Sequence, residues 1–558
     1  MTPTPAPVQA YSQAVALLQQ GHFGQAEKIA VRAQKTWPNS FDLLHLLGVI
    51  RLQCGKPGSA LGLFEQALRL QPDSPDATSN MAMTLSMLGR RDEALVLFDK
   101  ACALNPADWQ IRNSRGSLLL QLDRAEEALV NFEQALSMAP HFDFRLNRGV
   151  ALAQLRRFVE AIAEFDAVLV QQPGQADAHF NRGNALTGLG RVEEAIAAYD
   201  RALALRPNYL KALTSRGVAF QALNRNREAI ADYERVLASD KNNADARHNM
   251  ALALLTLGNY RLGFQQYESR WLRTGMPSRR TFGRPLWLGE FPPAHKTILL
   301  HAEQGLGDSI QFARYAPLLA RMGATVVLEA PRELTSLFAR IKGITQVVVR
   351  GEPLPPFDMH CPLGSLPLAL ATELSTVPAD VPYLEPAPDR IARWQERLAG
   401  MPSRRIAIAW AGNVNHPNDR NRSIGFERLA APFSCDAGFV SIQRDLSDKD
   451  AAAMAGIPQL FHVGSGLDDF DDTAAVLSLV DLVVSVDTSV AHLAGALGRP
   501  AFVLLPFAPD WRWMLDRADS PWYPTARLFR QPAPGDWASV IGMVRAELDR
   551  PLLDPKFT

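Results

Sequence analysis

The sequence predicts an α-solenoid followed by an α/β domain that is built from two doubly wound, Rossmann-like lobes. Two observations support this prediction. Prolines recur through the first half at positions 38, 72, 106, 140, 173 and 207, with intervals of 33 or 34 residues. From about residue 297, short apolar runs alternate with helical patterns, which is typical of parallel sheets with crossover helices.

The repeat unit has a fixed internal pattern. Its eighth position is small in every unit: Ala14, Gly48, Ala82, Gly116, Gly149, Gly183 and Gly217. Its twenty-fourth position is aromatic in most units: Phe64, Phe98, Phe132, Phe165, Tyr199 and Tyr233. This pattern resembles the tetratricopeptide repeat, in which two antiparallel helices meet at the small residue. We expect about eight repeats over 7–275, the last one degraded and acting as a cap.

The sixth position of the repeat is polar in nearly every unit. Its residues are Ser12, Leu46, Asn80, Ser114, Asn147, Asn181, Ser215 and Asn249. The pattern is similar to the asparagine ladder of protein O-GlcNAc transferases, which implies a groove where Asn80, Asn147, Asn181 and Asn249 hold a peptide backbone. The alternative is that these residues are the ordinary polar lining of a solvated inner face.

The second half divides into a linker at 276–296, a first lobe at 297–390 and a second lobe at 391–558. In the first lobe we expect a strand at 297–300, a glycine-rich turn at 303–308 and a helix at 309–322, followed by further strand and helix alternation. The second lobe is predicted to begin its sheet at 405–410. Facing lobes of this kind place the carboxyl ends of both sheets at one cleft.

The stretch 481–506 reads as a buried strand, a polar turn, a short helix and a second strand. The turn is Asp487-Thr488-Ser489. Unpaired N–H groups and the helix dipole favour an anion at such a helix start, and a diphosphate is one that fits. The alternative is that Asp487 or Thr488 only caps the helix.

Two stretches carry a resemblance to glycosyltransferase family 9, the ADP-heptosyltransferase-like enzymes. They are GLGDSIQFARYAPLLA and VDTSVAHLAGALGRP, and they occur in the family's order. The resemblance implies a GT-B fold and inverting transfer of a sugar from a nucleotide-diphosphate donor. Together with the repeats, the chain resembles bacterial tetratricopeptide proteins that carry a glycosyltransferase-like C-terminal domain.

The resemblance also implies roles for single residues. Asp308 matches the proposed catalytic base, and Gly305 and Gly307 form the cleft loop that lets a substrate approach the backbone. Asp487, Thr488 and Ser489 match the phosphate-binding turn, with His492 beside it. The alternatives are that Asp308 caps its helix and that His492 is a packing residue.

Four further residues are candidate donor ligands. Arg420 and Arg422 lie where the family carries a basic residue, although heptosyltransferases typically have lysine at the nearest match, so the donor can differ. Asn413 and Gln443 end predicted strands at the cleft. Capping of turns is the alternative role for both amides.

No cofactor and no metal are predicted beyond the nucleotide-sugar co-substrate. The acidic run 468–472 contains a DxD pattern, but it directly precedes an apolar helical segment, where carboxylates favour the helix start. The aromatic cluster around Trp511, Trp513 and Trp522 is expected to pack inside a loop.

Composition narrows the function classes. Lys+Arg and Asp+Glu both number 58, so the chain has no net positive charge that would attract nucleic acid or an anionic membrane. The four cysteines form no CxxC pair, and no apolar run approaches the roughly 18 residues of a membrane span. We therefore expect a cytoplasmic glycosyltransferase whose repeats recruit a protein acceptor. The alternatives are a repeat scaffold with a vestigial or nucleotide-sensing domain, and a transferase with a glycan acceptor.

Overall fold

The computed structural model describes residues 7–139, 141–275, 278–414, 418–430 and 436–549. Residues 276–277 of the predicted linker and 550–558 of the predicted second lobe lie outside this range. The chain forms two compact units, Met1–Ala212 and Leu213–Thr558. The final repeat helices therefore share a compact unit with the α/β region.

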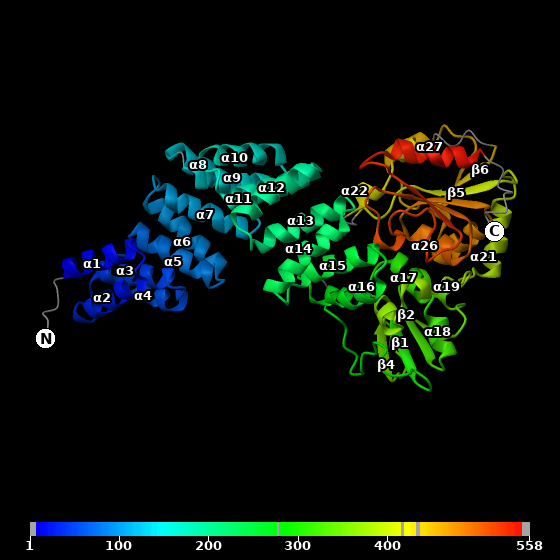
Figure 1. Ribbon diagram of the computed structural model, residues 1–558, viewed down its shortest axis with the longest axis horizontal. Helices are drawn as coiled ribbons and strands as arrows, with labels where there is room; N and C mark the ends of the chain where they lie inside the picture. Colours follow the sequence, from blue (N-terminus) through cyan, green and yellow to red (C-terminus); the bar gives the residue numbers. More distant parts are fainter. Residues whose placement is uncertain (1–6, 140, 276–277, 415–417, 431–435, 550–558) are drawn as a thin grey trace. The chain divides into compact units, whose positions relative to one another are not determined.

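Consecutive antiparallel helices build the repeat region, which confirms the predicted solenoid (Figure 1). They are α1 (Pro7–Gln19), α2 (Phe23–Thr36), α3 (Phe41–Gln53), α4 (Pro57–Leu70), α5 (Pro75–Met87), α6 (Arg91–Leu104), α7 (Trp109–Gln121), α8 (Ala125–Met138), α9 (Phe142–Gln154), α10 (Phe158–Gln171), α11 (Ala176–Gly188), α12 (Val192–Leu205), α13 (Leu210–Ala222), α14 (Asn226–Ser239), α15 (Ala244–Thr256) and α16 (Tyr260–Tyr267). A 3-10 turn, η1 (Glu268–Leu272), ends the series.

The periodic small residue has a direct steric cause. A Cβ added to Gly149 would lie 2.5 Å from the ring of Phe165, and one added to Gly183 would lie 2.5 Å from the ring of Tyr199. The aromatic residue of the second helix thus fills the space that the first helix leaves by having no side chain there. This packing explains why the small eighth residue and the aromatic twenty-fourth residue recur together in successive repeats.

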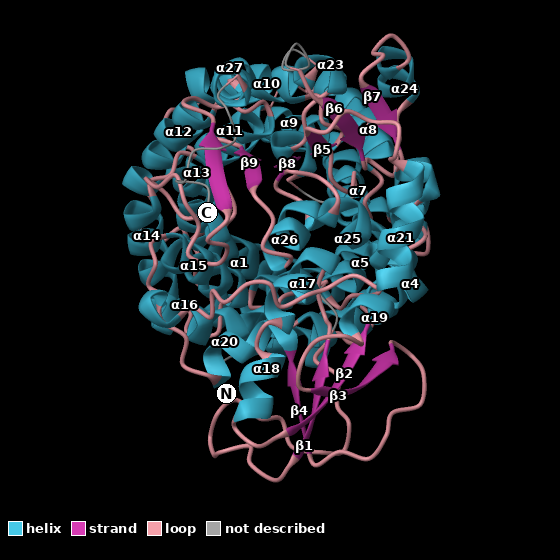
Figure 2. Cartoon of the chain, turned by 90° about the vertical axis from the view of Figure 1, so that its right-hand side faces the viewer, coloured by secondary structure: helices cyan, strands magenta, loops and turns pink. Residues whose placement is uncertain are grey.

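The first lobe contains a four-stranded parallel sheet in the order β3-β2-β1-β4 (Figure 2). Its elements are β1 (Thr297–His301), α17 (Leu306–Ala313), α18 (Ala316–Arg321), β2 (Thr325–Ala330), α19 (Arg332–Phe338), β3 (Ile344–Val349), β4 (Met359–Pro362) and α20 (Leu366–Ala369). Helices α18 and α19 pack on one face. On the other face, Phe282 and Phe357 from loops cover Leu299, Val327 and Val348.

The second lobe contains a six-stranded parallel sheet in the order β10-β9-β8-β5-β6-β7. Its elements are α21 (Pro388–Arg397), β5 (Arg405–Ala409), α22 (Asp419–Arg422), α23 (Phe426–Leu429), β6 (Gly438–Ser441), α24 (Asp448–Met454), β7 (Leu460–His462), α25 (Phe470–Ser478), β8 (Leu482–Val486), α26 (Ser489–Ala496), β9 (Ala501–Leu505), β10 (Ala526–Arg530) and α27 (Trp537–Leu548). Alternate strand residues enter different cores, one shared with α25 and α26 and the other with α23 and α27. The sheet is therefore covered on both faces, as the doubly wound prediction requires.

One predicted element differs from the structure. The helix expected at 309–322 is two helices, α17 and α18, separated by Arg314 and Tyr315. Pro317 lies in the first turn of α18. Because proline has no N–H group, it cannot donate to the carbonyl of Ala313, and the first helix ends there.

The last repeat packs directly on the α/β region. Tyr260 stacks on Trp522 with ring centroids 5.8 Å apart, and Phe264 meets Trp511 edge-on at 5.6 Å. The indole N–H of Trp522 donates to the Tyr260 hydroxyl over 3.0 Å. Among the described residues, no helix combines the length and the apolar character that crossing a bilayer requires.

Candidate functional site

Each sheet has one switch point, where the strand order reverses direction along the chain. In the second lobe the chain runs from β5 outward to β6 and β7, and then returns to place β8 on the other side of β5. In the first lobe the same reversal lies between β1 and β4. Open parallel sheets bind ligands outside the carboxyl ends of the strands at such points.

The start of α26 lies at the second-lobe switch point, directly after β8. The Thr488 hydroxyl accepts the N–H of Val490 over 3.3 Å, so Thr488 is the N-cap of the helix. Ser489 is the first helical residue, and its N–H has no hydrogen-bond partner within the described part of the chain. Arg422 follows β5, and its Nη1 donates to the carbonyl of Asp487 over 3.0 Å. The structure thus brings Arg422 together with the predicted phosphate turn.

Asp487 and His492 are buried beside this helix start. Burial raises the pKa of the Asp487 carboxyl to about 6, and the nearby Asp510 carboxylate acts in the same direction; Trp513, Arg512 and Arg422 oppose the shift. His492 stacks on Trp513, and its Nδ1 lies 2.9 Å from the hydroxyl of Tyr523.

The pKa of His492 falls well below its usual value, because burial disfavours the cation and neighbouring arginines repel it. The imidazole is therefore neutral at physiological pH. Its contacts agree with a packing role, which was the alternative to donor binding.

The glycine-rich loop of the first lobe lies against this region, since α17 packs on α26 (Figure 1). A Cβ added to Gly307 would lie 2.8 Å from Cδ2 of His492 and 3.5 Å from Cα of Ser489. Gly305 is the N-cap of α17, and its N–H donates to Oδ2 of Asp308 over 3.0 Å. The predicted cleft loop and the predicted phosphate turn are thus brought together.

Arg512 connects the two lobes at this position. Its Nη2 is paired with Oδ1 of Asp308, its Nε donates to Oε1 of Gln311, and its Nη1 lies 2.8 Å from Oδ1 of Asp510. The Arg512 side chain is only 8% exposed. Both carboxylate oxygens of Asp308 are therefore occupied, one by a backbone N–H and one by a buried guanidinium.

The other predicted donor ligands are Arg420, Gln443 and Asn413. Arg420 is exposed on α22, and it forms no hydrogen bond or ion pair with the described residues. Gln443 accepts the N–H groups of Trp410 and Ala411 over 3.2 and 3.1 Å, so its amide holds the end of β5. Asn413 is exposed in the loop that follows β5.

The predicted ladder residues lie on the first helices of their repeats, namely α5, α9, α11 and α15. Nδ2 of Asn80 lies 2.9 Å from Nε2 of His45, and Nδ2 of Asn147 donates to Oδ1 of Asn113 over 2.9 Å. Both partners belong to the preceding repeat. Asn181 and Asn249 are likewise half-buried.

The acidic run 468–472 lies at the start of α25, as the sequence predicted. The Asp469 side chain accepts the N–H groups of Asp471 and Asp472 and caps α25. The buried Asp471 pairs with Arg340, and the buried Asp472 pairs with Arg390 and Arg393. Arginines thus neutralise the two buried carboxylates of this run.

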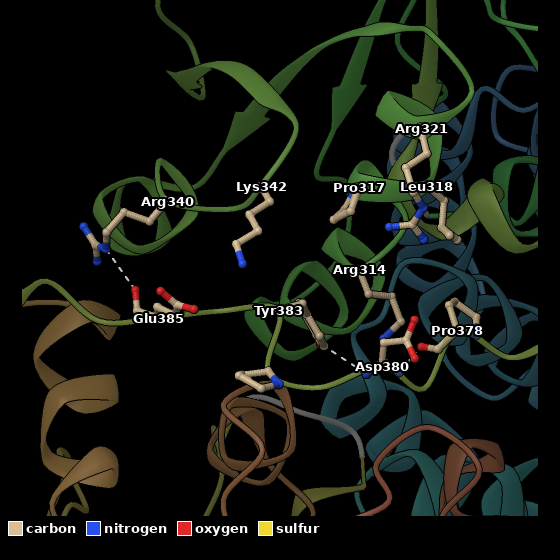
Figure 3. Close-up of a pocket in the computed structure, with 11 residues that line it drawn as sticks. Arg314, Pro317, Leu318, Arg321, Arg340, Lys342, Pro378, Asp380, Tyr383 and Glu385 are labelled. Carbon is tan, nitrogen blue, oxygen red and sulfur yellow. Dashed lines mark hydrogen bonds between the residues drawn. The ribbon is translucent and has the colours of Figure 1, made fainter.

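The structure also contains a cavity of about 160 Å³ (Figure 3). It is bounded by α18, the end of α19 and the segment 378–385 that leads to the second lobe. Arg314 donates to the carbonyls of Pro378 and Trp522 over 3.0 and 2.6 Å, and Arg340 donates to the Glu385 carbonyl over 2.9 Å. Its lining includes none of the predicted site residues.

Two residues near the glycine-rich loop had no role assigned from sequence. Glu303 follows β1, and Arg270 comes from η1 at the end of the repeats. Nη2 of Arg270 donates to Oε1 of Glu303 over 3.2 Å. A charged residue just after a buried strand was a signal for Glu303, whereas nothing local in the sequence could show that Arg270 reaches the first lobe.

Comparison with known proteins agrees with this architecture. Tetratricopeptide repeat profiles match residues 11–75, 51–115, 110–142, 127–176, 176–209 and 214–278. The profile of glycosyltransferase family 9 (heptosyltransferase) matches residues 466–506, which contain α25, β8, α26 and β9. Protein FlbA of Caulobacter vibrioides is 28% identical over 324 residues, 52% of this chain and 53% of FlbA. The match thus spans about half the length of that relative.

Two solved structures are also similar. A tetratricopeptide repeat protein from Parabacteroides merdae is 20% identical and has a TM-score of 0.38, with 44% of this chain and 99% of that chain covered. YrrB, described as a TPR protein with an unusual peptide-binding site, is 23% identical and has a TM-score of 0.29, with 33% and 95% covered. The chain therefore combines tetratricopeptide repeats across its N-terminal region with a C-terminal α/β region that contains a segment matching glycosyltransferase family 9.

Proposed function

We propose that this chain is a glycosyltransferase that moves a sugar from a nucleotide-diphosphate donor to a protein acceptor recruited by its repeats. Transfer is inverting and needs no metal ion. The observation that carries the proposal is the meeting of the two switch points, where Gly307 of the first lobe lies against His492 of the second. A donor held in one lobe and an acceptor held in the other would react at this meeting place.

The donor binds at the second lobe. The Ser489 N–H, the dipole of α26 and the guanidinium of Arg422 supply positive potential at one location. These groups stabilise the charge that develops on the departing diphosphate, which is the task that a metal ion performs in other transferases. The Thr488 and Ser489 hydroxyls add donors for phosphate oxygens, and Asp487 orients the turn.

The acceptor enters from the side of the last repeat. The last repeat contacts the cleft loop directly, since Nε2 of Gln304 donates to the Tyr267 hydroxyl over 2.7 Å. Asn80, Asn147, Asn181 and Asn249 recur at one position of the repeat and present amides that can bond to an extended peptide backbone. A carboxylate of the loop 303–308 takes the proton of the acceptor hydroxyl.

Calorimetric titration with a panel of nucleoside diphosphates and nucleotide sugars tests the donor site. Arg422→Gln is expected to weaken binding roughly 10-fold or more, because a charge-assisted hydrogen bond contributes about 1.5–3 kcal/mol. Arg428→Gln, an exposed position on α23, serves as the matched control and should bind like the wild type. If no nucleotide of the panel binds, the scaffold function replaces the proposal.

Intact-mass and glycopeptide analysis of cells with and without the gene tests the acceptor. A sugar that is lost from a protein in the deletion strain identifies donor sugar and acceptor together. Loss from a glycan with unchanged proteins contradicts the protein acceptor while leaving sugar transfer intact.

A further inference from the structure

Glu303 occupies the switch point of the first lobe. It follows β1, and its Oε1 accepts the N–H of Gly364, which follows β4, over 3.0 Å. The same oxygen accepts Nη2 of Arg270 over 3.2 Å. The second oxygen, Oε2, has no hydrogen-bond partner among the residues that the structure describes, although the side chain is only 8% exposed.

The surroundings hold this carboxyl group in place. A Cβ added to Gly364 would lie 2.6 Å from Oε1 of Glu303, so the close approach requires a glycine. Arg270 is itself fixed, with Nη1 2.5 Å from Oε1 of Glu268 and Nη2 2.7 Å from the hydroxyl of Ser365. The carboxyl group is thus positioned by both the repeats and the first lobe.

Asp308, five residues further along, has a different environment. One of its oxygens accepts the Gly305 N–H, and the other is paired with the buried guanidinium of Arg512. A general base needs an oxygen that can receive a proton from the substrate, and Oε2 of Glu303 accepts no hydrogen bond from the described residues.

The charges around Glu303 favour proton uptake near neutral pH. Burial raises its pKa to about 7, Arg270 and the Gly364 N–H lower it, and the Asp308 carboxylate raises it. Glu268 of η1 and the buried thiol of Cys361 on β4 are the other titratable groups in this cluster. A base with a pKa near the working pH combines an available carboxylate with adequate basicity.

We propose that Glu303, rather than Asp308, is the general base of sugar transfer, and that Asp308 is a positioning residue for Arg512 and for the start of α17. This assignment rests on the proposed function. The acceptor O–H bond breaks and its proton passes to Oε2 of Glu303. The acceptor oxygen forms a bond to the anomeric carbon of the donor, while the bond from that carbon to the diphosphate oxygen breaks and its electron pair leaves with the diphosphate.

The test is the pH dependence of kcat, measured with the donor that the titration identifies and the acceptor that the glycopeptide analysis identifies. For the wild type, the rate should rise with pH through an apparent pKa near 7 and then level off. Glu303→Gln should lower kcat by about 100-fold or more and abolish this rise. Asp308→Asn should keep the rise but move it to lower pH, because the carboxylate that raises the pKa of Glu303 is gone.

Glu268→Gln is the matched control, because Glu268 is the other carboxylate that pairs with Arg270. In this variant the rate should still rise with pH as in the wild type. Glu303→Ala with added formate distinguishes a catalytic role of Glu303 from a structural one. Formate should restore part of the rate only if the variant lacks a carboxylate that takes part in the reaction. A pH-dependent rise that persists in Glu303→Gln and disappears in Asp308→Asn overturns the assignment. A wild-type chain that binds no donor and transfers no sugar instead overturns the proposed function, and the assignment falls with it.

Discussion

The guanidinium of Arg512 joins the two lobes by pairing with the carboxylate of Asp308, 204 residues away in the sequence. Asp510 and Gln311 complete its hydrogen bonding, and the Arg512 side chain is almost wholly buried. The pair ties the start of α17 to the loop after β9. One buried cation therefore connects the two lobes at this position.

Removing this cation should destabilise the α/β region. Arg512→Gln is expected to lower the free energy of unfolding by about 3 kcal/mol, because Asp308 and Asp510 are left without their buried partner. Urea denaturation measures the change. Arg517→Gln is the control in the same loop, since its partner Asp519 is 68% exposed and a surface pair contributes less than about 1 kcal/mol. Equal effects of the two substitutions would contradict the structural role of Arg512.

Gly307 should tolerate no side chain. In Gly307→Ala, the new methyl group would meet the ring of His492, which cannot turn away because it stacks on Trp513 and is held by Tyr523. We expect a loss of about 1–3 kcal/mol in the free energy of unfolding. Gly400→Ala, where a Cβ meets no atom within 4 Å, should leave stability nearly unchanged. If Gly307→Ala is as stable as the control, the two helix starts are not in the contact described.

Much of this architecture follows from local patterns. The buried strand predicted at the start of 481–506 is β8, because a short β-branched run between polar residues has few alternatives. The repeats were predictable because each glycine and its aromatic partner are separated by a fixed 16 residues, as in Gly149 and Phe165. The meeting of Asp487 and Arg422 followed from the rule that strand ends share one edge of a sheet.

The remainder depends on contacts between distant segments. Arg270 belongs to the repeat region by pattern, yet it binds Glu303 of the first lobe. Arg512 lies in an aromatic cluster whose packing was predicted, but its pairing with Asp308 depends on how the two lobes meet. The residues next to Arg270 and Arg512 in the sequence carry no information about a partner in another domain. The pairing of Asp308 with Arg512 could therefore not be predicted.

The contact of the last repeat with the α/β region can be tested through one hydrogen bond. Tyr260→Phe removes the acceptor of the buried Trp522 indole N–H. An unpaired buried donor should lower the free energy of unfolding by about 1–3 kcal/mol. Tyr11→Phe, at an exposed position, is the control and should have little effect. A Tyr260→Phe protein with wild-type stability would show that this repeat is not a structural part of the α/β unit.

Asp487 should make stability depend on pH in an unusual direction. An unfolded aspartate releases its proton near pH 4, whereas the pKa of the folded Asp487 is raised to about 6. Between these values the folded state binds the additional proton. The contribution of Asp487 to the free energy of unfolding therefore falls as the pH rises from about 4 to about 6, and stays low above that.

Asp487→Asn removes this penalty and keeps the size of the side chain. We expect the variant to be more stable than the wild type at pH 8, by an amount on the order of 2 kcal/mol, with the difference shrinking toward zero near pH 4. Urea denaturation at a series of pH values measures it. His492 has a lowered pKa, and it changes stability in the opposite direction in both proteins, so it cancels from the comparison. A variant less stable than the wild type at pH 8 would mean that the charged carboxylate is favourably paired in the folded chain. A stabilised variant would instead confirm that the charged Asp487 carboxylate lowers the stability of the folded chain above pH 6.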